Sequence, residues 1–428
     1  MRNRSLVCAL LLALCACGGG AGPAGDGGAG GGAGSGSSSD GGSGGGGSSG
    51  GGSGGSGGGA ACIGVTCSGH GTCTTSGSSP VCTCDPGYGS AGTTECVASD
   101  SPALGGCPML PADNLFNTEI VGLDPHPDSA AFMATIGEHN LHLDLGTQTD
   151  PGEDDYWGIP YNVVHGNGLS WTSVRYDGAP DESDCTVASA GGAHTIVSPC
   201  TAERAPDPVF PIPASPLVES GLAPGGDHHM LVVDADTCRL WELYGTSPYS
   251  GSGWEIYGSA GFDLRSNTLR PDEWTSADAA GFPMLPLLLR VDEASSGVIR
   301  HALRFTNPSS TIRGEHVWPA RHHTYDNMSS ALPAMGQLFR LKSTYTIPDS
   351  FNTQARAILQ ALKTYGMYLA DNSGGSSMYI QGEPSAAWEE DTFSQVQSVS
   401  SSEFEAVDLS EFTSRPGFDP DSGRVPPR

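Results

Sequence analysis

Two apolar runs around a short polar turn lie at the centre of the chain: Met230-Leu231-Val232-Val233 and Arg239-Leu240-Trp241-Glu242-Leu243-Tyr244, on either side of Asp234-Ala235-Asp236-Thr237. β-Branched and aromatic residues in runs of this length are typical of strands, and Asp and Thr favour a turn. We therefore predict a β-hairpin over 230–244. Polar residues able to bind or react surround it, across residues 225–323.

Further strand-like runs surround this hairpin, whereas helical patterns are few. We expect strands at 141–145, 159–164, 171–176, 194–197, 298–306 and 337–341. Helices are expected at 128–136 and 354–368, with a last short turn at 403–408. Many short strands, abundant proline and few helices predict a mainly β fold, either a β-sandwich or an irregular barrel with a few helices.

Composition divides the 428 residues into several parts. Residues 18–59 are almost entirely Gly, Ser and Ala, which predicts a flexible linker. A cysteine-rich segment follows at 60–97, then a short linker at 98–106. We expect the β-rich main domain at 107–408 and a disordered tail at 409–428, because those last residues are polar.

The first 17 residues have the pattern of an export signal. Arg2 and Arg4 precede an apolar run that is too short to cross a bilayer. The segment ends Leu14-Cys15-Ala16-Cys17-Gly18, which resembles the lipobox of bacterial lipoproteins. This resemblance implies that Cys17 is lipidated and that the exported chain meets the outer membrane or cell surface through that lipid alone. A plain cleaved secretory signal is the alternative.

Six cysteines in the segment 60–97 have the spacing C-x4-C-x5-C-x8-C-x-C-x11-C: Cys62, Cys67, Cys73, Cys82, Cys84 and Cys96. With Gly69-His70-Gly71 and Asp85-Pro86-Gly87-Tyr88-Gly89, this segment resembles an EGF-like module. The resemblance implies the pairs Cys62–Cys73, Cys67–Cys82 and Cys84–Cys96. No calcium site is expected, because Gly59-Ala60-Ala61 stands where calcium-binding members carry acids.

Four cysteines lie in the main domain: Cys107, Cys185, Cys200 and Cys238. Cys185 and Cys200 flank a Gly-rich stretch and are the preferred pair, which leaves Cys107 for Cys238. Three pairings are possible. No CxxC pair occurs among the four, so we expect no metal there. Thirteen cysteines in clusters favour an oxidising compartment.

The formal net charge of −28 at pH 7 disfavours polyanionic partners. Such a chain repels nucleic acid, so no nucleic-acid partner is expected.

The main domain resembles a set of bacterial extracellular proteins without an assigned activity. The resemblance is carried by Gly226–Asp234, Trp274–Gly281, His301–Phe305, Trp318–Arg321 and residues 365–372. It implies no function.

Three acids are candidates for catalysis. A glycoside hydrolase needs two carboxyl groups across a cleft, one of them kept protonated. On an alternating strand Glu242 shares a face with Leu240 and Tyr244, and burial there would raise its pKa. Asp278 is the expected partner and Asp227 the reserve. A structural role as a cap, a turn former or an arginine partner is the alternative for each.

Histidine, arginine and tryptophan residues nearby suggest how a substrate is held. A lyase would use a His base and an Arg against a uronate, and tryptophans stack on sugar rings. The histidines are not spaced as a metal motif, so we expect neither metal nor cofactor. The substrate-binding candidates are His229, His301, Arg321, His322, Trp274 and Trp318.

Together these patterns predict a surface-anchored carbohydrate-active protein, with a glycoside hydrolase using paired carboxylates favoured. The expected partner is an extracellular glycan or a cell-surface protein. The alternatives are a non-catalytic adhesion or glycan-binding protein and a polysaccharide lyase.

Overall fold

The computed structural model describes residues 60–67, 71–76, 79–84, 88–90, 94, 96–98, 102–146, 157–189, 191–222, 226–249, 253–374 and 378–427. The chain separates into two units, Met1–Gly55 and Ser56–Arg428, and all described residues lie in the second. The predicted signal, Cys17 and the linker at 18–59 lie outside the described residues. Among the described helices, none is long and apolar enough to cross a membrane.

The six-cysteine segment forms two small antiparallel ribbons. β1 (Gly71–Ser76) pairs with β2 (Ser79–Cys84), and β3 (Tyr88–Ser90) pairs with β4 (Cys96–Ala98). The disulfides Cys62–Cys73 and Cys67–Cys82 confirm two of the implied pairs. The third, Cys84–Cys96, lies outside the described side chains.

A four-stranded sheet with the order β17-β14-β13-β8 lies at the centre of the main domain. Its strands are β8 (Tyr161–Val164), β13 (Met230–Asp234), β14 (Arg239–Tyr244) and β17 (Gly258–Asp263). Met230 pairs with Leu243 across β13 and β14, which confirms the predicted hairpin. All five residues of β13 are buried. A strand covered on both faces carries apolar side chains on both, which is why Met230–Val233 does not alternate.

One face of this central sheet packs on a six-stranded sheet with the order β11-β10-β12-β9-β16-β15. Its strands are β9 (Thr172–Tyr176), β10 (Cys185–Ala188), β11 (His194–Val197), β12 (Pro208–Phe210), β15 (Ser247–Tyr249) and β16 (Gly253–Ile256). Phe210 meets Trp241 of β14 edge-on at 5.2 Å in the core between the sheets. The arrangement is a β-sandwich.

The other face of the central sheet joins a larger core with a second six-stranded sheet, ordered β24-β21-β22-β18-β23-β7. Its strands are β7 (His142–Asp144), β18 (Leu303–Pro308), β21 (Leu338–Leu341), β22 (Met367–Ser373), β23 (Tyr379–Gln381) and β24 (Phe404–Ala406). Two short ribbons complete the strands: β5 (Ala103–Leu104) with β6 (Cys107–Pro108), and β19 (Arg313–His316) with β20 (Ala334–Met335).

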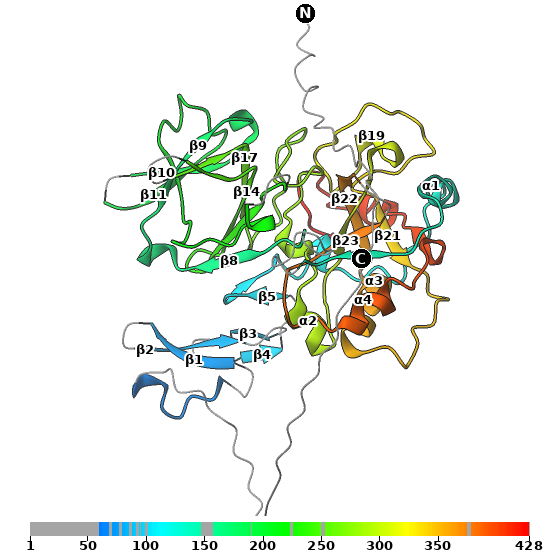
Figure 1. Cartoon of the computed structure of the whole chain (residues 1–428), viewed down its shortest axis with the longest axis horizontal. Helices are drawn as coiled ribbons and strands as arrows, with labels where there is room; N and C mark the ends of the chain where they lie inside the picture. Colours follow the sequence, from blue (N-terminus) through cyan, green and yellow to red (C-terminus); the bar gives the residue numbers. More distant parts are fainter. Residues whose placement is uncertain are drawn as a thin grey trace, which may run out of the picture. The chain divides into compact units, whose positions relative to one another are not determined.

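Helices are few. They are α1 (Ser129–Ile136), α2 (Val291–Ser296), α3 (Thr353–Thr364), α4 (Glu390–Val396) and α5 (Ser410–Thr413). Of these, α1, α3 and α4 contact this second sheet. α3 packs on β21, with α2 and α4 beside it (Figure 1). The predicted mainly β fold with a few helices is confirmed, and the described strands form open sheets rather than a closed barrel.

Several boundaries differ from the prediction, and at three of them a strand forms where none was expected. The helix expected to reach residue 368 ends at Thr364, because Gly366 has φ +75° and β22 begins at Met367. Residues 404–406 of the turn expected at 403–408 form the strand β24. Part of the linker expected at 98–106 forms β5.

The prediction of a disordered tail is wrong for residues 410–427. The Leu115 N–H donates to the Gly423 carbonyl at 2.8 Å, and the Val425 N–H donates to the Asp113 carbonyl at 2.9 Å. The polar composition of these residues did not indicate this order, because the tail is held by backbone hydrogen bonds to the start of the domain.

Both preferred disulfides of the main domain are confirmed. Cys185 pairs with Cys200, and Cys107 pairs with Cys238 across a sequence separation of 131. Multiple disulfides indicate an oxidising, extracellular environment.

Candidate functional site

A pocket of about 240 Å³ brings three aspartates and two tyrosines together. They are Asp227, Tyr244, Tyr257, Asp278 and Asp371. A larger hollow of about 630 Å³ lies beside α1, but these five residues are absent from the described residues that line it. The smaller pocket is therefore the candidate site.

One edge of the central sheet supplies the first wall. β13 begins, β14 ends and β17 begins at this edge, because the three strands are antiparallel neighbours. Asp227 precedes β13, and Tyr244 is the last residue of β14. The Tyr244 hydroxyl approaches Asp227 Oδ1 at 3.5 Å, and the Gly245 N–H donates to the Asp227 carbonyl at 3.1 Å.

The second sheet supplies Asp371 from β22. β22 runs parallel to β18, and a bulge in the pairing sets Asp371 opposite Thr306. The Ala279 N–H donates to Asp371 Oδ2 at 3.3 Å. The side chain of Asp371 is 23% exposed. Burial and the charge of Asp278 raise the pKa of Asp371 to about 7, although Arg304 opposes this rise. The charge of Asp227 adds to it, so these acids lie within electrostatic reach.

Asp278 is buried and paired with an equally buried arginine. Arg304 donates to Asp278 Oδ2 from Nε at 3.1 Å and from Nη2 at 2.6 Å. The same Nη2 lies 3.8 Å from Asp371 Oδ2. Burial raises the pKa of Asp278, and the arginine opposes that rise. One guanidinium therefore serves two carboxylates.

Glu242 lies behind the pocket and is not among the described residues that line it. It is fully buried, and its Oε1 accepts the N–H groups of Met284 at 2.8 Å and Leu285 at 3.1 Å. Burial raises its pKa to about 7, as the sequence analysis expected, against these hydrogen bonds. These hydrogen bonds hold residues 284 and 285, which follow the pocket wall at 275–279 in the sequence. The expected pairing of Glu242 with Asp278 across a cleft is thus not the geometry found.

His229 supports the same wall from inside. Its Nδ1 lies 2.6 Å from Glu219 Oε2, and its Nε2 lies 2.9 Å from the Ala277 carbonyl. Burial alone would lower the pKa of His229, but the charge and hydrogen bond of Glu219 outweigh it and raise the pKa to about 9. A protonated ring donates to both acceptors, so His229 holds the wall.

The other five binding candidates are also absent from the described residues lining the pocket. His301 contacts Glu293 at 2.9 Å, and Arg321 contacts Asp421 at 2.7 Å. His322 contacts the Ala279 carbonyl at 2.9 Å behind the wall. Two tryptophans pack locally: Trp274 lies under Arg270 at 5.5 Å, and Trp318 lies edge-on to Phe418 at 5.1 Å.

Sequence reasoning did not select Asp371, Tyr244 or Tyr257 as site residues. One signal was present: Asp371 follows the apolar run Met367–Ala370. Functional side chains often lie where the chain leaves a buried element. Its closeness to Asp278 depends on pairing between distant strands.

Comparisons with known proteins give no assignment. No family model matches the chain, and no curated protein or solved structure matches it.

Proposed function

We propose that this protein is an exported carbohydrate-active enzyme, a glycoside hydrolase whose site is the pocket of Asp227, Asp278 and Asp371. The observation that carries the proposal is Asp371. Its pKa is raised to about 7, and its carboxyl group is partly exposed. It lines the same pocket as the exposed acid Asp227.

The two outer acids suit different steps. A general acid must hold a proton at the working pH, and Asp371 does so through burial and its neighbouring carboxylates. It would protonate the oxygen of the departing sugar. Asp227 is exposed and is held in place by its backbone. Its carboxylate would activate water or attack the sugar carbon. The Tyr244 hydroxyl beside it would orient that carboxylate.

The inner groups keep this arrangement in place. Asp278 neutralises Arg304, so the guanidinium remains next to Asp371 without removing its proton. Tyr257 is 45% exposed and lines the same pocket, where its ring offers a surface for a sugar.

The proposal extends to the cell surface. Lipidation of Cys17 would anchor the chain, residues 18–59 would serve as its tether, and the EGF-like module would lie between tether and enzyme. This arrangement suits an extracellular glycan as substrate. The disulfides of the described segment support the exported state.

The test incubates the purified, oxidised chain with a broad panel of polysaccharides and reads new reducing ends. Wild type should release them from at least one glycan, and Asp371→Asn should not. Asp349→Asn is the matched control, because that acid is fully exposed in a surface pair with Arg356. Retention on a glycan without cleavage would instead identify a binding protein, and ultraviolet absorbance of an unsaturated uronate would identify a lyase. Either result rejects the hydrolase.

A further inference from the structure

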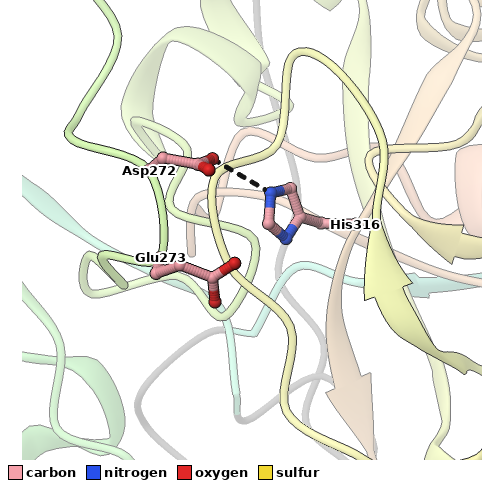
Figure 2. Close-up of side chains that lie close together, drawn as sticks. All are labelled: Asp272, Glu273 and His316. Atoms are coloured by element: carbon pink, nitrogen blue, oxygen red, sulfur yellow. Dashed lines mark hydrogen bonds and ion pairs between the residues drawn. The ribbon is translucent and has the colours of Figure 1, made fainter.

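A second group of chemical side chains lies outside the pocket, where the loop before the pocket wall meets β19. Asp272, Glu273 and His316 each place a ligand atom within 4.8 Å of the others. Figure 2 shows the two carboxylates and the imidazole turned toward one another. Asp272 Oδ1 and His316 Nε2 are 3.1 Å apart. Two ligands of one zinc ion are separated by about 3 to 3.5 Å, given metal–ligand distances near 2.0–2.2 Å.

The opposite side of the imidazole supplies an independent observation. His316 Nδ1 lies 3.4 Å from Nδ1 of His323, and the two rings are stacked. A metal-binding histidine needs a partner for its other ring nitrogen, since that partner fixes the tautomer and the ring orientation. His323 can accept the Nδ1 proton, which leaves the Nε2 lone pair of His316, beside Asp272, free for a metal ion.

The local charge favours a divalent cation. Asp272 is 63% exposed, and the Glu273 side chain has no hydrogen-bond or ion-pair partner among the described residues. Arg321 lies 3.7 Å from Asp272, but its nearer partner is Asp421 at 2.7 Å. Because Asp421 offsets this arginine, the carboxylates of Asp272 and Glu273 keep two negative charges beside His316.

We infer that Asp272, Glu273 and His316 form a binding site for a divalent transition-metal ion of the zinc class. One imidazole with two carboxylates suits such an ion, whereas calcium and magnesium prefer oxygen ligands alone. Water completes the coordination on the exposed side. The sequence analysis expected no metal, because the histidines are not spaced as a metal motif. Asp272 and His316 are 44 residues apart, so no local pattern joins them.

Metal binding would join two segments that lead to the pocket, because Thr275–Ala279 and Thr324 line it. The Glu273 N–H donates to the Arg321 carbonyl at 2.7 Å, and Thr275 to Ala279 follow as pocket wall. An ion shared with His316 would hold the start of that wall against β19. This inference does not depend on the hydrolase, because binding is measured without turnover.

The test titrates ZnCl₂ into the tag-free, chelator-treated chain by calorimetry, with MgCl₂ and CaCl₂ as comparison ions. Wild type should bind one zinc ion more tightly than magnesium or calcium. Glu273→Gln and His316→Ala should each weaken zinc binding at least about 10-fold, and His323→Ala should weaken it about 10-fold. Glu273→Gln is the safest variant for folding, because that side chain has no partner among the described residues.

His165→Ala is the matched control. His165 also contacts an aspartate, Asp236 at 2.8 Å, but it belongs to no three-ligand group among the described residues. This variant should bind zinc as wild type does. The inference is overturned if wild type binds no zinc, if Glu273→Gln and His316→Ala both bind it unchanged, or if His165→Ala is the variant that loses it.

Discussion

Two pairs of acids in this domain have the same chemistry and different surroundings. Asp227 and Asp371 reach the pocket surface, whereas Glu242 and Asp278 are fully buried. Burial raises the pKa of Glu242 and of Asp371 to the same value, about 7. Only Asp371 of these two is partly exposed. A raised pKa therefore does not identify a catalytic acid by itself, because a buried acid that holds backbone N–H groups shows it too.

The largest expected effect is on the buried ion pair between Arg304 and Asp278. Arg304→Ala would leave Asp278 buried without its partner, and loss of one member of a buried ion pair costs about 3–5 kcal/mol of unfolding free energy. Urea denaturation measures it. Arg356→Ala removes a surface pair and should change the midpoint little. If the two variants unfold at the same urea concentration, the ion pair between Arg304 and Asp278 does not stabilise the fold.

The second prediction concerns the pH dependence that Glu242 contributes. Its folded pKa of about 7 lies above the ordinary value of 4.5, so folding favours the protonated carboxyl group. The stability it contributes is complete below 4.5 and is lost as pH rises through about 7. Between about pH 4 and pH 8 this loss is about 3 kcal/mol.

Glu242→Gln isolates that loss, because the amide cannot ionise. As pH rises from about 4 to about 8, the unfolding free energy of the variant minus that of wild type should increase by about 3 kcal/mol. Denaturant midpoints at several pH values give the comparison. Parallel pH profiles for the two proteins would mean that Glu242 does not titrate in the folded domain.

The third prediction concerns the outer acid. Asp371→Asn should lower kcat/KM at least about 100-fold, because general acid catalysis contributes on that scale. Wild-type activity should also fall as pH rises through about 7, since the proton of Asp371 is lost there. A full rate in the variant, or activity that increases above that pH, would move the acid role elsewhere.

The smallest effect is expected from the pocket rim. Tyr257→Ala should raise KM about 5-fold with kcat nearly unchanged, as loss of about 1 kcal/mol of ring contact would do. Tyr249→Ala is the control, because Tyr249 is 42% exposed and packs against Arg175 rather than the pocket. Equal KM values for both variants would remove Tyr257 from the site.

Local patterns were sufficient for much of the fold. The hairpin at 230–244 has its turn residues beside its strands, and Cys185 and Cys200 flank one Gly-rich stretch. Contacts between distant segments were less accessible. The tail at 410–427 is ordered by hydrogen bonds to residues near 113–115, which its own composition cannot indicate.

The site divides in the same way. Asp227 and Asp278 were selected from their local sequence, and both line the pocket. Asp371 meets Ala279 across 92 residues, and its position depends on the pairing of β18 with β22. Glu242 was selected because its strand face is apolar, and that same burial keeps it out of the pocket wall.

The disulfide Cys107–Cys238 also determines how the domain bears a mechanical load. A pull on the N-terminal side enters the main domain at Cys107 and passes covalently to Cys238, which precedes β14. The 130 residues between the two cysteines are bypassed and cannot be drawn out one after another. If the proposed tether pulls against a glycan in the proposed pocket, the covalent path from Cys107 continues through Cys238 into β14, so reducing this one bond should lower the force at which the domain extends.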